Sequence, residues 1–377
     1  MGTGTTCMVS NFDTMMNASK KSIKSSVLRI MVGVALVGFE SCSLFNQGVS
    51  YSQDIFTNLT APEEGGVNFT QLTKESDIVQ GPAYQLTTES VQNGSEITRT
   101  EVLMWNTATF LSISPDGRNF TFLGNNNNSN NLYIRSTEGG ASAVQRTFRN
   151  YVFDFAYSPD GKFLTFSDRV GVGAAENYNI YQIEVAKGNA VRQIAATDAS
   201  ELNPVYSNDA KTLFYSRSSG NGYSLWSIDL ESGLHTQYSE GFNPCFVPGK
   251  SSKELFVTRS AKNSQRTEIW KIDLDGGAET QVITDNRRSF SSPKVSPNGK
   301  YLMVSGATPK SNARPMNLDL YLFRTDGTGE TQLTFHPGTD ASAVWAPSGK
   351  EIYFISTRGS ATNKYNVWRM SVEQFLN

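Results

Sequence analysis

The sequence predicts an all-β protein, a six-bladed β-propeller of four-stranded antiparallel blades, on three observations. A turn motif of the type Ser-Pro-Asp-Gly-Lys recurs six times, at intervals of about 40 to 50 residues. Each copy is followed by two short runs in which apolar and polar residues alternate, as in half-buried strands. Gly, Ser, Thr and Asn are abundant, which suits short strands joined by tight turns. Six in-phase units of this kind are typical of propeller blades and argue against a β-sandwich with repeated turns.

The composition of this 377-residue chain excludes several classes of function. Hydrophobic residues make up 38% and aromatic residues 11%, so a large core can be buried. The formal net charge is −2 and no basic run occurs downstream of Arg29, so the electrostatic footprint of a nucleic-acid binder is missing. The two histidines and three cysteines, none in a C-x-x-C pair, predict neither a metal site nor a redox pair, and no cofactor is expected.

The turn motif explains how the first two strands of each unit are joined. Pro at its second position presets φ, Asp or Asn hydrogen-bonds the local backbone, and Gly takes a positive φ. The six copies, from the closest to the most degraded, are Ser114–Arg118, Ser158–Lys162, Ser296–Lys300, Ala346–Lys350, Ser207–Lys211 and Val247–Lys250.

The alternating runs supply the second and third strands of each unit. The second-strand runs are Phe120–Leu123, Phe163–Phe166, Leu213–Ser216, Leu255–Thr258, Tyr301–Val304 and Ile352–Ile355. The third-strand runs are Leu132–Ile134, Ile180–Ile183, Leu225–Ile228, Ile269–Ile272, Leu320–Phe323 and Val367–Met370.

Closure of the ring can also be predicted. Most units end in an outer-strand motif such as Thr331–Thr334, but the last unit has none, whereas Phe69–Thr73 matches the motif and stands alone before the first unit. We therefore expect residues 67–73 to supply the outer strand of the sixth blade, which removes exposed sheet edges. Residues 74–105 are an insertion between this strand and the first unit.

The chain is predicted to contain a targeting segment (1–42), a flexible tether (43–66) and the propeller (67–377). In the targeting segment, basic residues precede an apolar run, Ile30–Phe39, that has the length of a signal-peptide core and is too short to span a bilayer. The Phe-Glu-Ser-Cys sequence after it resembles the lipobox of bacterial lipoproteins, which implies lipidation of Cys42. A cleaved signal without lipid, an uncleaved anchor and a chance apolar stretch are the alternatives. Cys245 is expected to be a buried, small apolar residue.

The motifs between about residues 67 and 375 resemble the TolB-like β-propeller repeat family, whose turn reads SPDG-K and whose loop reads S-x-R-x-G. The loop motif occurs here as Ser356–Gly359 and in part as Ser167–Arg169, Ser216–Arg217 and Thr258–Arg259. The chain has no room for the α/β domain that precedes the propeller in TolB itself. The resemblance therefore implies the fold and an envelope location, and does not transfer TolB's partner or role.

Recognition is expected on the loops between second and third strands, because variable polar loops on a rigid frame commonly bind partners. Arginines recur there in five units, at Arg169, Arg217, Arg259, Arg314 and Arg358. A ring of guanidinium groups near the channel could bind carboxylates or an acidic peptide; alternatively, each arginine braces its own blade. Acidic residues near the entries of the inner strands could pair with these arginines or hold a cation; they are Asp154, Glu201 and Asp340.

Known catalytic motifs, including G-x-S-x-G, the P-loop and H-E-x-x-H, do not occur in the sequence. The sequence therefore predicts a non-catalytic, monomeric lipoprotein of the bacterial envelope that faces the periplasm, with the outer membrane as the expected site. Its expected partners are an envelope protein or peptide and, through the lipid, the membrane. The alternative is a propeller that binds or cleaves carbohydrate, because paired acids in a ring leave no sequence pattern.

Overall fold

The computed structural model describes residues 59–376 with several gaps. The gaps are residues 83, 92–96, 105–108, 172–175, 189, 220–221, 248–252, 263, 265, 309–316 and 361. The predicted targeting segment with Cys42, most of the predicted tether, and Arg314 lie outside the described residues. The proposed boundary between targeting segment and tether therefore stays a prediction.

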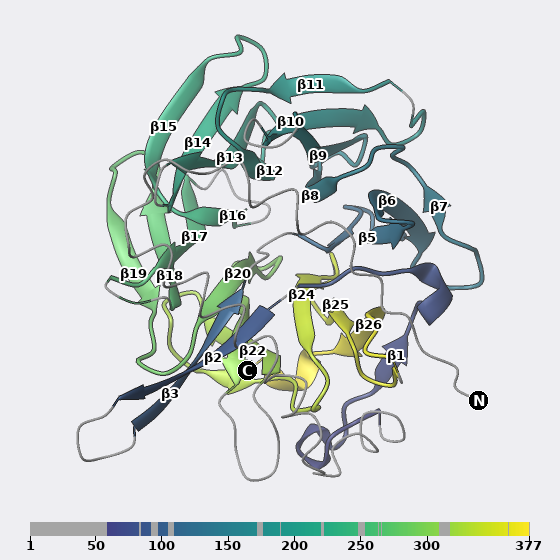
Figure 1. The fold of residues 1–377 in the computed structure, drawn as a ribbon, viewed down its shortest axis with the longest axis vertical. Helices are drawn as coiled ribbons and strands as arrows, with labels where there is room; N and C mark the ends of the chain where they lie inside the picture. The colour runs from purple at the N-terminus through teal and green to yellow at the C-terminus, as the bar shows by residue number, and fades with distance from the viewer. Residues whose placement is uncertain are drawn as a thin grey trace, which may run out of the picture. The chain divides into compact units, whose positions relative to one another are not determined.

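Six four-stranded antiparallel sheets form the bulk of the described chain, so the predicted six-bladed β-propeller is confirmed (Figure 1). From inner to outer strand, blade 1 contains β4 (Leu111–Ile113), β5 (Asn119–Asn126), β6 (Ser129–Ser136) and β7 (Val144–Gln145); blade 2 contains β8 (Val152–Tyr157), β9 (Phe163–Val170), β10 (Asn177–Glu184) and β11 (Arg192–Ala195); blade 3 contains β12 (Glu201–Tyr206), β13 (Thr212–Ser219), β14 (Gly222–Asp229) and β15 (His235–Glu240).

The second half of the ring repeats this order. Blade 4 contains β16 (Phe242–Phe246), β17 (Glu254–Ser260), β18 (Thr267–Asp273) and β19 (Glu279–Ile283); blade 5 contains β20 (Phe290–Val295), β21 (Tyr301–Thr308), β22 (Asn317–Arg324) and β23 (Thr331–Gln332); blade 6 contains β24 (Asp340–Trp345), β25 (Glu351–Ser356), β26 (Asn366–Ser371) and β1 (Phe69–Gln71). The inner strands contact one another in cyclic order, from β4 to β24 and back to β4.

The remaining elements are small. A two-stranded antiparallel hairpin, β2 (Tyr84–Val91) and β3 (Ile97–Met104), lies within the predicted insertion. The helical elements among the described residues are single 3₁₀ turns, η1 (Pro62–Glu64), η2 (Glu75–Asp77) and η4 (Glu373–Phe375).

The repeated turn has the hydrogen bonds that its sequence predicts. In blade 1, the Ser114 hydroxyl donates to Asp116 Oδ1 (2.6 Å) and accepts the Asn119 N–H (3.0 Å). Asp116 Oδ1 also accepts the Arg118 N–H (3.0 Å), and Gly117 has a φ of 72°. The bond from the Ser114 hydroxyl lowers the pKa of Asp116, so the carboxylate is ionised and keeps the turn closed. The same bonds recur at Ser158, Ser207 and Ser296.

Aromatic side chains at the ends of inner strands join three of the blades to the blade before them. The Tyr157 hydroxyl of blade 2 lies 2.5 Å from Thr121 Oγ1 of blade 1, and the Tyr206 hydroxyl of blade 3 bonds Thr165 of blade 2. The Trp345 indole N–H of blade 6 donates to the Lys294 carbonyl of blade 5 (2.9 Å). Polar bonds therefore cross the otherwise apolar contact between blades.

The hydrophobic core lies between neighbouring blades. Phe120 and Phe122 of blade 1 are buried in a cluster that includes residues of blades 2 and 6. The Phe120 ring packs against Tyr353 of blade 6, with centroids 6.4 Å apart. Cys245 lies in the cluster between blades 4 and 5 and is buried with a free thiol, as the sequence predicts.

The predicted closure of the ring is also confirmed. Strand β1 pairs antiparallel with β26, so that Phe69 lies opposite Met370 and Gln71 lies opposite Trp368 (Figure 1). Beyond the strand, the Thr73 hydroxyl accepts the N–H of Val367 (2.8 Å). The chain's first propeller strand therefore completes the last blade.

The threonine that ends the outer strand makes the same bond in two other blades. Thr147 Oγ1 accepts the Leu132 N–H (2.8 Å) in blade 1, and Thr334 Oγ1 accepts the Leu320 N–H (2.9 Å) in blade 5. In each case a glutamine two residues earlier donates its amide to the carbonyl of the threonine. The Gln-x-Thr sequence is thus a local clasp between third and outer strands.

We expect Thr73→Val to destabilise the ring closure, because the buried N–H of Val367 loses its acceptor while the side-chain volume is kept. The free energy of unfolding should fall by about 1–3 kcal/mol, measured by urea denaturation. Thr70→Val is the matched control, since Thr70 is exposed on the same strand. Equal stability of the two variants would show that the clasp does not contribute.

Candidate ligand-binding cavity at the centre of the ring

A cavity of about 870 Å³ lies at the centre of the propeller, and the inner strand of every blade contributes to its wall. This volume falls within the range of pockets that bind small molecules or short peptide segments. The lining residues of the strands are Leu111, Ser112, Ile113, Phe155, Ala156, Tyr157, Asn203, Pro204, Val205, Tyr206, Asn243, Pro244, Cys245, Phe246, Lys294, Val295, Val344 and Trp345.

The mouth of the cavity is formed by the repeated turns. Four turn prolines line it, Pro115, Pro159, Pro297 and Pro347. Neighbouring turns touch: an added Cβ at Gly117 would lie 3.3 Å from Pro347, and one at Gly161 would lie 3.5 Å from Pro115. The mouth is therefore rigid and largely apolar, and it opens on the turn face rather than on the loop face where the sequence placed recognition.

The inner strands are bulged where they pass the cavity. The pairing register shifts in the inner strands of blades 2 to 6. In four of them a non-glycine residue adopts the left-handed conformation, with φ of 52° at Asn203, 49° at Asn243, 55° at Ser292 and 51° at Ser342. A bulge turns backbone groups away from the ladder, so these groups are free to bond across to a neighbouring blade.

A polar belt of Thr109, Asp154, Asn203 and Asn243 joins blades 1 to 4 at these bulges. Asp154 accepts the N–H of Thr109 (2.7 Å) and the N–H of Asn203 (3.1 Å), one at each carboxylate oxygen. Asn203 Oδ1 accepts the N–H of Asn243 (3.3 Å). Burial raises the pKa of Asp154 to about 7, against the opposing effect of these hydrogen bonds and of the Lys294 charge. Near neutral pH this carboxyl is therefore only partly ionised.

The sequence interpretation missed most of the belt, although a signal for it was present. Asn-Pro pairs at 203–204 and 243–244 and a Ser-Pro pair at 292–293 occupy equivalent places in three inner strands. Pro lacks a ladder donor and is found at bulges, and Asn tolerates a positive φ. An Asn-Pro pair inside a predicted strand thus indicates a bulge.

Arg169, Arg217 and Arg259 each lie over an aromatic ring and do not line the cavity. The guanidinium carbon is 3.3 Å from the ring centroid of Tyr151 for Arg169, 4.9 Å from Trp226 for Arg217, and 4.7 Å from Trp270 for Arg259. Two of these arginines also form ion pairs, Arg169 with Glu176 (3.2 Å) and Arg259 with Glu279 (2.8 Å). These contacts are stabilising ones within or beside the arginine's own blade.

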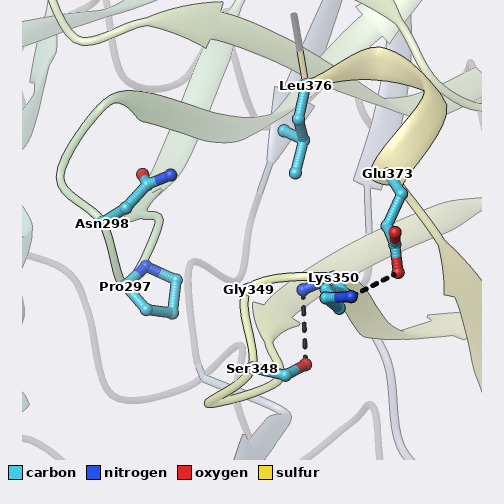
Figure 2. A pocket seen from close by; sticks show the side chains of 7 residues that line it. All are labelled: Pro297, Asn298, Ser348, Gly349, Lys350, Glu373 and Leu376. Carbon is cyan, nitrogen blue, oxygen red and sulfur yellow. Dashed lines mark hydrogen bonds and ion pairs between the residues drawn. The ribbon is translucent and has the colours of Figure 1, made fainter.

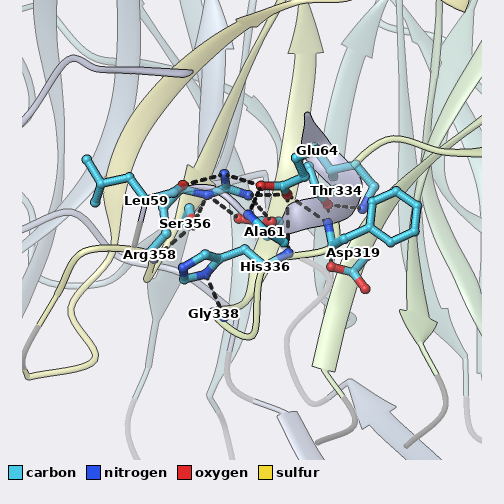
Figure 3. Close-up of polar contacts among 12 residues, drawn as sticks. Leu59, Ala61, Glu64, Asp319, Thr334, His336, Gly338, Ser356 and Arg358 are labelled. Atoms are coloured by element: carbon cyan, nitrogen blue, oxygen red, sulfur yellow. Dashed lines mark hydrogen bonds and ion pairs between the residues drawn. The ribbon is translucent and has the colours of Figure 1, made fainter. Parts of the chain in front are cut away.

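Arg358 is fully buried at the junction of blade 6 with the segment that precedes β1 (Figure 3). Its guanidinium donates to Asp340 Oδ2 (2.6 Å), to Glu64 Oε1 (3.1 Å) and to the Leu59 carbonyl (3.1 Å). Burial raises the pKa of Asp340, although the Arg358 charge opposes this shift. One guanidinium thus pairs with two buried carboxylates.

Glu64 also anchors the backbone around it. Its carboxylate accepts the N–H groups of Ala61 (2.8 Å), Phe335 (2.7 Å) and His336 (3.2 Å). Residues 59–66 belong to the tether predicted from their polar composition, but the described structure places them against blade 6. The physical reason is the Glu64–Arg358 pair, which local sequence composition does not reveal.

The described candidate residues therefore do not form a single site. Arg358 and Asp340 lie together, Asp154 belongs to the polar belt, and Glu201 is buried beside Thr197, whose hydroxyl bonds its carboxylate. Burial raises the pKa of Glu201. The expected ring of arginines around a channel is not seen among the four that the structure describes.

A second cleft, of about 480 Å³, lies on the turn face between blade 5 and the C-terminal end of the chain (Figure 2). Lys350 crosses it to Glu373, with Nζ 3.4 Å from Oε1, and both side chains are more than half exposed. The cleft is open, and its charged groups already form a pair with each other.

Two further features are absent from the part of the chain that the structure describes. None of the helices in the part of the chain that the structure describes is long and apolar enough to cross a membrane. No group of three or more His, Cys, Asp or Glu side chains among those same residues is placed to hold a metal ion.

The ring of six blades defines a six-bladed β-propeller whose central cavity opens on the turn face. The chain belongs to the TolB β-propeller family: the sequence model of the TolB beta propeller domain matches residues 92–314, more than half of the chain.

Individual relatives are more distant. The chain is 25% identical over 252 residues to the uncharacterized protein Atu1656 of Agrobacterium fabrum, a match that covers 64% of this chain and 82% of that protein. Among solved structures, it is similar to a candidate TolB of Agrobacterium tumefaciens, with a TM-score of 0.52 and 18% identity over 78% of this chain and 99% of that one. It is also similar to an oligogalacturonate lyase of Vibrio parahaemolyticus, with a TM-score of 0.50 and 11% identity over 82% and 99%. At these identities the structural likenesses show the fold alone.

We expect Arg358→Met to destabilise the protein by about 3–5 kcal/mol, because Glu64 and Asp340 would remain buried without a counter-charge. The deficit should shrink as the pH falls, since the two carboxyls then take up protons. Denaturant unfolding at several pH values measures both effects.

Arg169→Met is the matched control for this substitution. Arg169 is partly exposed, so its loss should cost at most about 1 kcal/mol. If Arg358→Met lowers the free energy of unfolding no more than Arg169→Met does, the buried ion pairs of Arg358 with Glu64 and Asp340 do not brace the structure.

Proposed function

We propose that this chain is a non-catalytic, cell-envelope propeller that binds a protein or peptide partner in its central cavity. The observation that supports this most directly is the cavity itself, which is built by all six inner strands and has a rigid, proline-lined mouth. A concave, mostly apolar pocket with a few polar groups, held on a rigid frame, is the usual form of a recognition site.

The charged groups of the cavity favour binding over hydrolysis. Among its described lining residues the ionisable acids and bases with a full charge are Asp209 and Lys294. Asp209 is committed to its own turn, where it accepts the Ser207 hydroxyl (2.7 Å) and the Lys211 N–H (3.0 Å). A glycosidase would need two carboxyls facing each other across the substrate, about 5–10 Å apart. The lining presents one acid, which supports a binding role.

The N-terminal sequence and the family support an envelope location. A basic stretch, a short apolar run and the lipobox-like end at Cys42 fit export and lipid attachment, and membership of the TolB propeller family is consistent with a periplasm-facing place. The proposed protein is a monomer held at the outer membrane by its lipid.

Cys42→Ser tests the anchor, because serine cannot accept the thioether-linked lipid. The variant should move from the membrane fraction to the soluble fraction of the cell, as measured by fractionation and blotting. Ser43→Ala is the matched control and should stay with the membrane. Unchanged membrane retention of Cys42→Ser would rule out lipidation at this position.

Ser112→Trp tests the cavity, because an indole on the β4 wall fills space that the partner would occupy. Envelope proteins that copurify with the native chain should be lost with this variant, as measured by affinity capture and mass spectrometry. Ser142→Trp, at an exposed position outside the cavity, should still capture them. Unfolding curves verify that both variants are folded. Equal capture by both, or turnover of oligosaccharides by the native chain, would overturn the proposal.

A further inference from the structure

Lys294 is the basic side chain among the described residues that line the central cavity. It lies on β20, and its backbone carbonyl is held by the Trp345 indole, so its place on the wall is fixed. The remaining wall is apolar or carries neutral hydroxyl and amide groups, apart from Asp209 at the rim. The cavity therefore has a single positive group in a mostly uncharged surrounding.

The ammonium group of Lys294 makes no ion pair and no hydrogen bond with the residues that the structure describes. Other lysines, such as Lys253 and Lys271, are paired with carboxylates at the surface. The Lys294 charge acts to lower the pKa of Asp154, against the effect of burial, but both oxygens of Asp154 already accept backbone N–H groups. The three donors of Lys294 are consequently available to a ligand.

A partly buried ammonium without a fixed counter-charge favours an anionic ligand. Burying a charge is costly unless it is paired, so a ligand that brings a carboxylate into the cavity relieves this cost. Asp154 does not supply the counter-charge fully, because burial keeps this carboxyl partly protonated near neutral pH.

The residues that line the cavity indicate which other groups the ligand carries beside its carboxylate. Prolines and aromatic side chains at the mouth, among them Pro115, Pro297 and Phe246, suit apolar side chains. This combination fits a short peptide segment better than a small inorganic anion.

We propose that Lys294 is the anchor of the central cavity and that the cavity binds a peptide through a carboxylate, supplied by the C-terminus or by an Asp or Glu side chain. This inference rests on the proposed function, since it names the ligand class for the same cavity. The carboxylate accepts hydrogen bonds from the Lys294 ammonium, and the neighbouring peptide residues contact the proline-lined mouth.

The test uses the full purified chain and two random octapeptide libraries of the same composition, one with free C-terminal carboxylates and one with C-terminal amides. Bound peptides are separated by gel filtration and identified by mass spectrometry. Peptides with a free carboxylate or with Asp and Glu should be enriched. Enrichment only in the first library assigns the C-terminal carboxylate, and equal enrichment of Asp and Glu in both assigns the side chain.

Substitutions then locate the anchor. For the selected peptides, Lys294→Gln should raise Kd about tenfold or more, which corresponds to about 1.4 kcal/mol, and Lys294→Arg should restore part of the affinity. Lys211→Gln, at an exposed lysine of a neighbouring turn, is the matched control and should leave Kd unchanged. The unfolding midpoint of Lys294→Gln should match that of the native chain, because this lysine pairs with nothing in the described structure.

The outcomes separate this inference from the proposed function. Peptides bound without acidic preference, with Kd unaffected by Lys294→Gln, would overturn the role of Lys294 and leave the peptide-binding cavity intact. A strongly lowered unfolding midpoint in Lys294→Gln would assign the lysine a structural role and overturn the inference as well. Failure of both libraries to bind, together with binding of acidic oligosaccharides that requires Lys294, would overturn both the peptide ligand and the proposed function.

Discussion

The antiparallel pairing of β1 with β26 is the constraint on which the rest of the structure depends. It brings residues from the beginning of the described chain into the last blade and turns six consecutive units into a closed ring. In the closed ring the inner strands of all six blades line the central cavity, and the three-residue strand β1 completes the sheet of blade 6 beside blade 1. The buried Glu64–Arg358 pair lies directly beside this closure and stabilises it from the N-terminal side.

The fold could be predicted from the sequence because its determinants are local. The bonds between Ser114, Asp116 and Asn119 lie within six residues, so the turn motif is visible in the sequence, and its repetition gave the blade number. The closing strand was predicted for the same reason, since the Gln71–Thr73 clasp repeats that of Gln332–Thr334. Where one unit repeats in phase, local chemistry is sufficient to define the ring.

The candidate site could be predicted only in part, because its contacts join distant segments. Arg217 lies near the end of β13 and Arg358 directly follows β25. Arg358 is nevertheless fully buried and Arg217 is not, and Arg358 pairs with Glu64, which is 294 residues away in sequence. Lys294 likewise has no distinguishing neighbours along the chain. Lys294 is surrounded by uncharged side chains because other blades contribute those side chains to the cavity wall. These blades are distant in sequence, so no short stretch of sequence reveals the surroundings of Lys294.

The ion pairs of Arg358 with Glu64 and Asp340 determine how a pull on the N-terminal side of the propeller would be transmitted. Tension applied to the chain before Glu64 reaches the Glu64–Arg358 pair before it reaches Phe69, because Glu64 precedes β1. Within blade 6, that tension would be shared between the Arg358 guanidinium, which is hydrogen-bonded to two carboxylates, and the hydrogen bonds of the closing strand β1. A pull from the N-terminal side would therefore have to break the ion pairs of Arg358 as well as the pairing of β1 with β26.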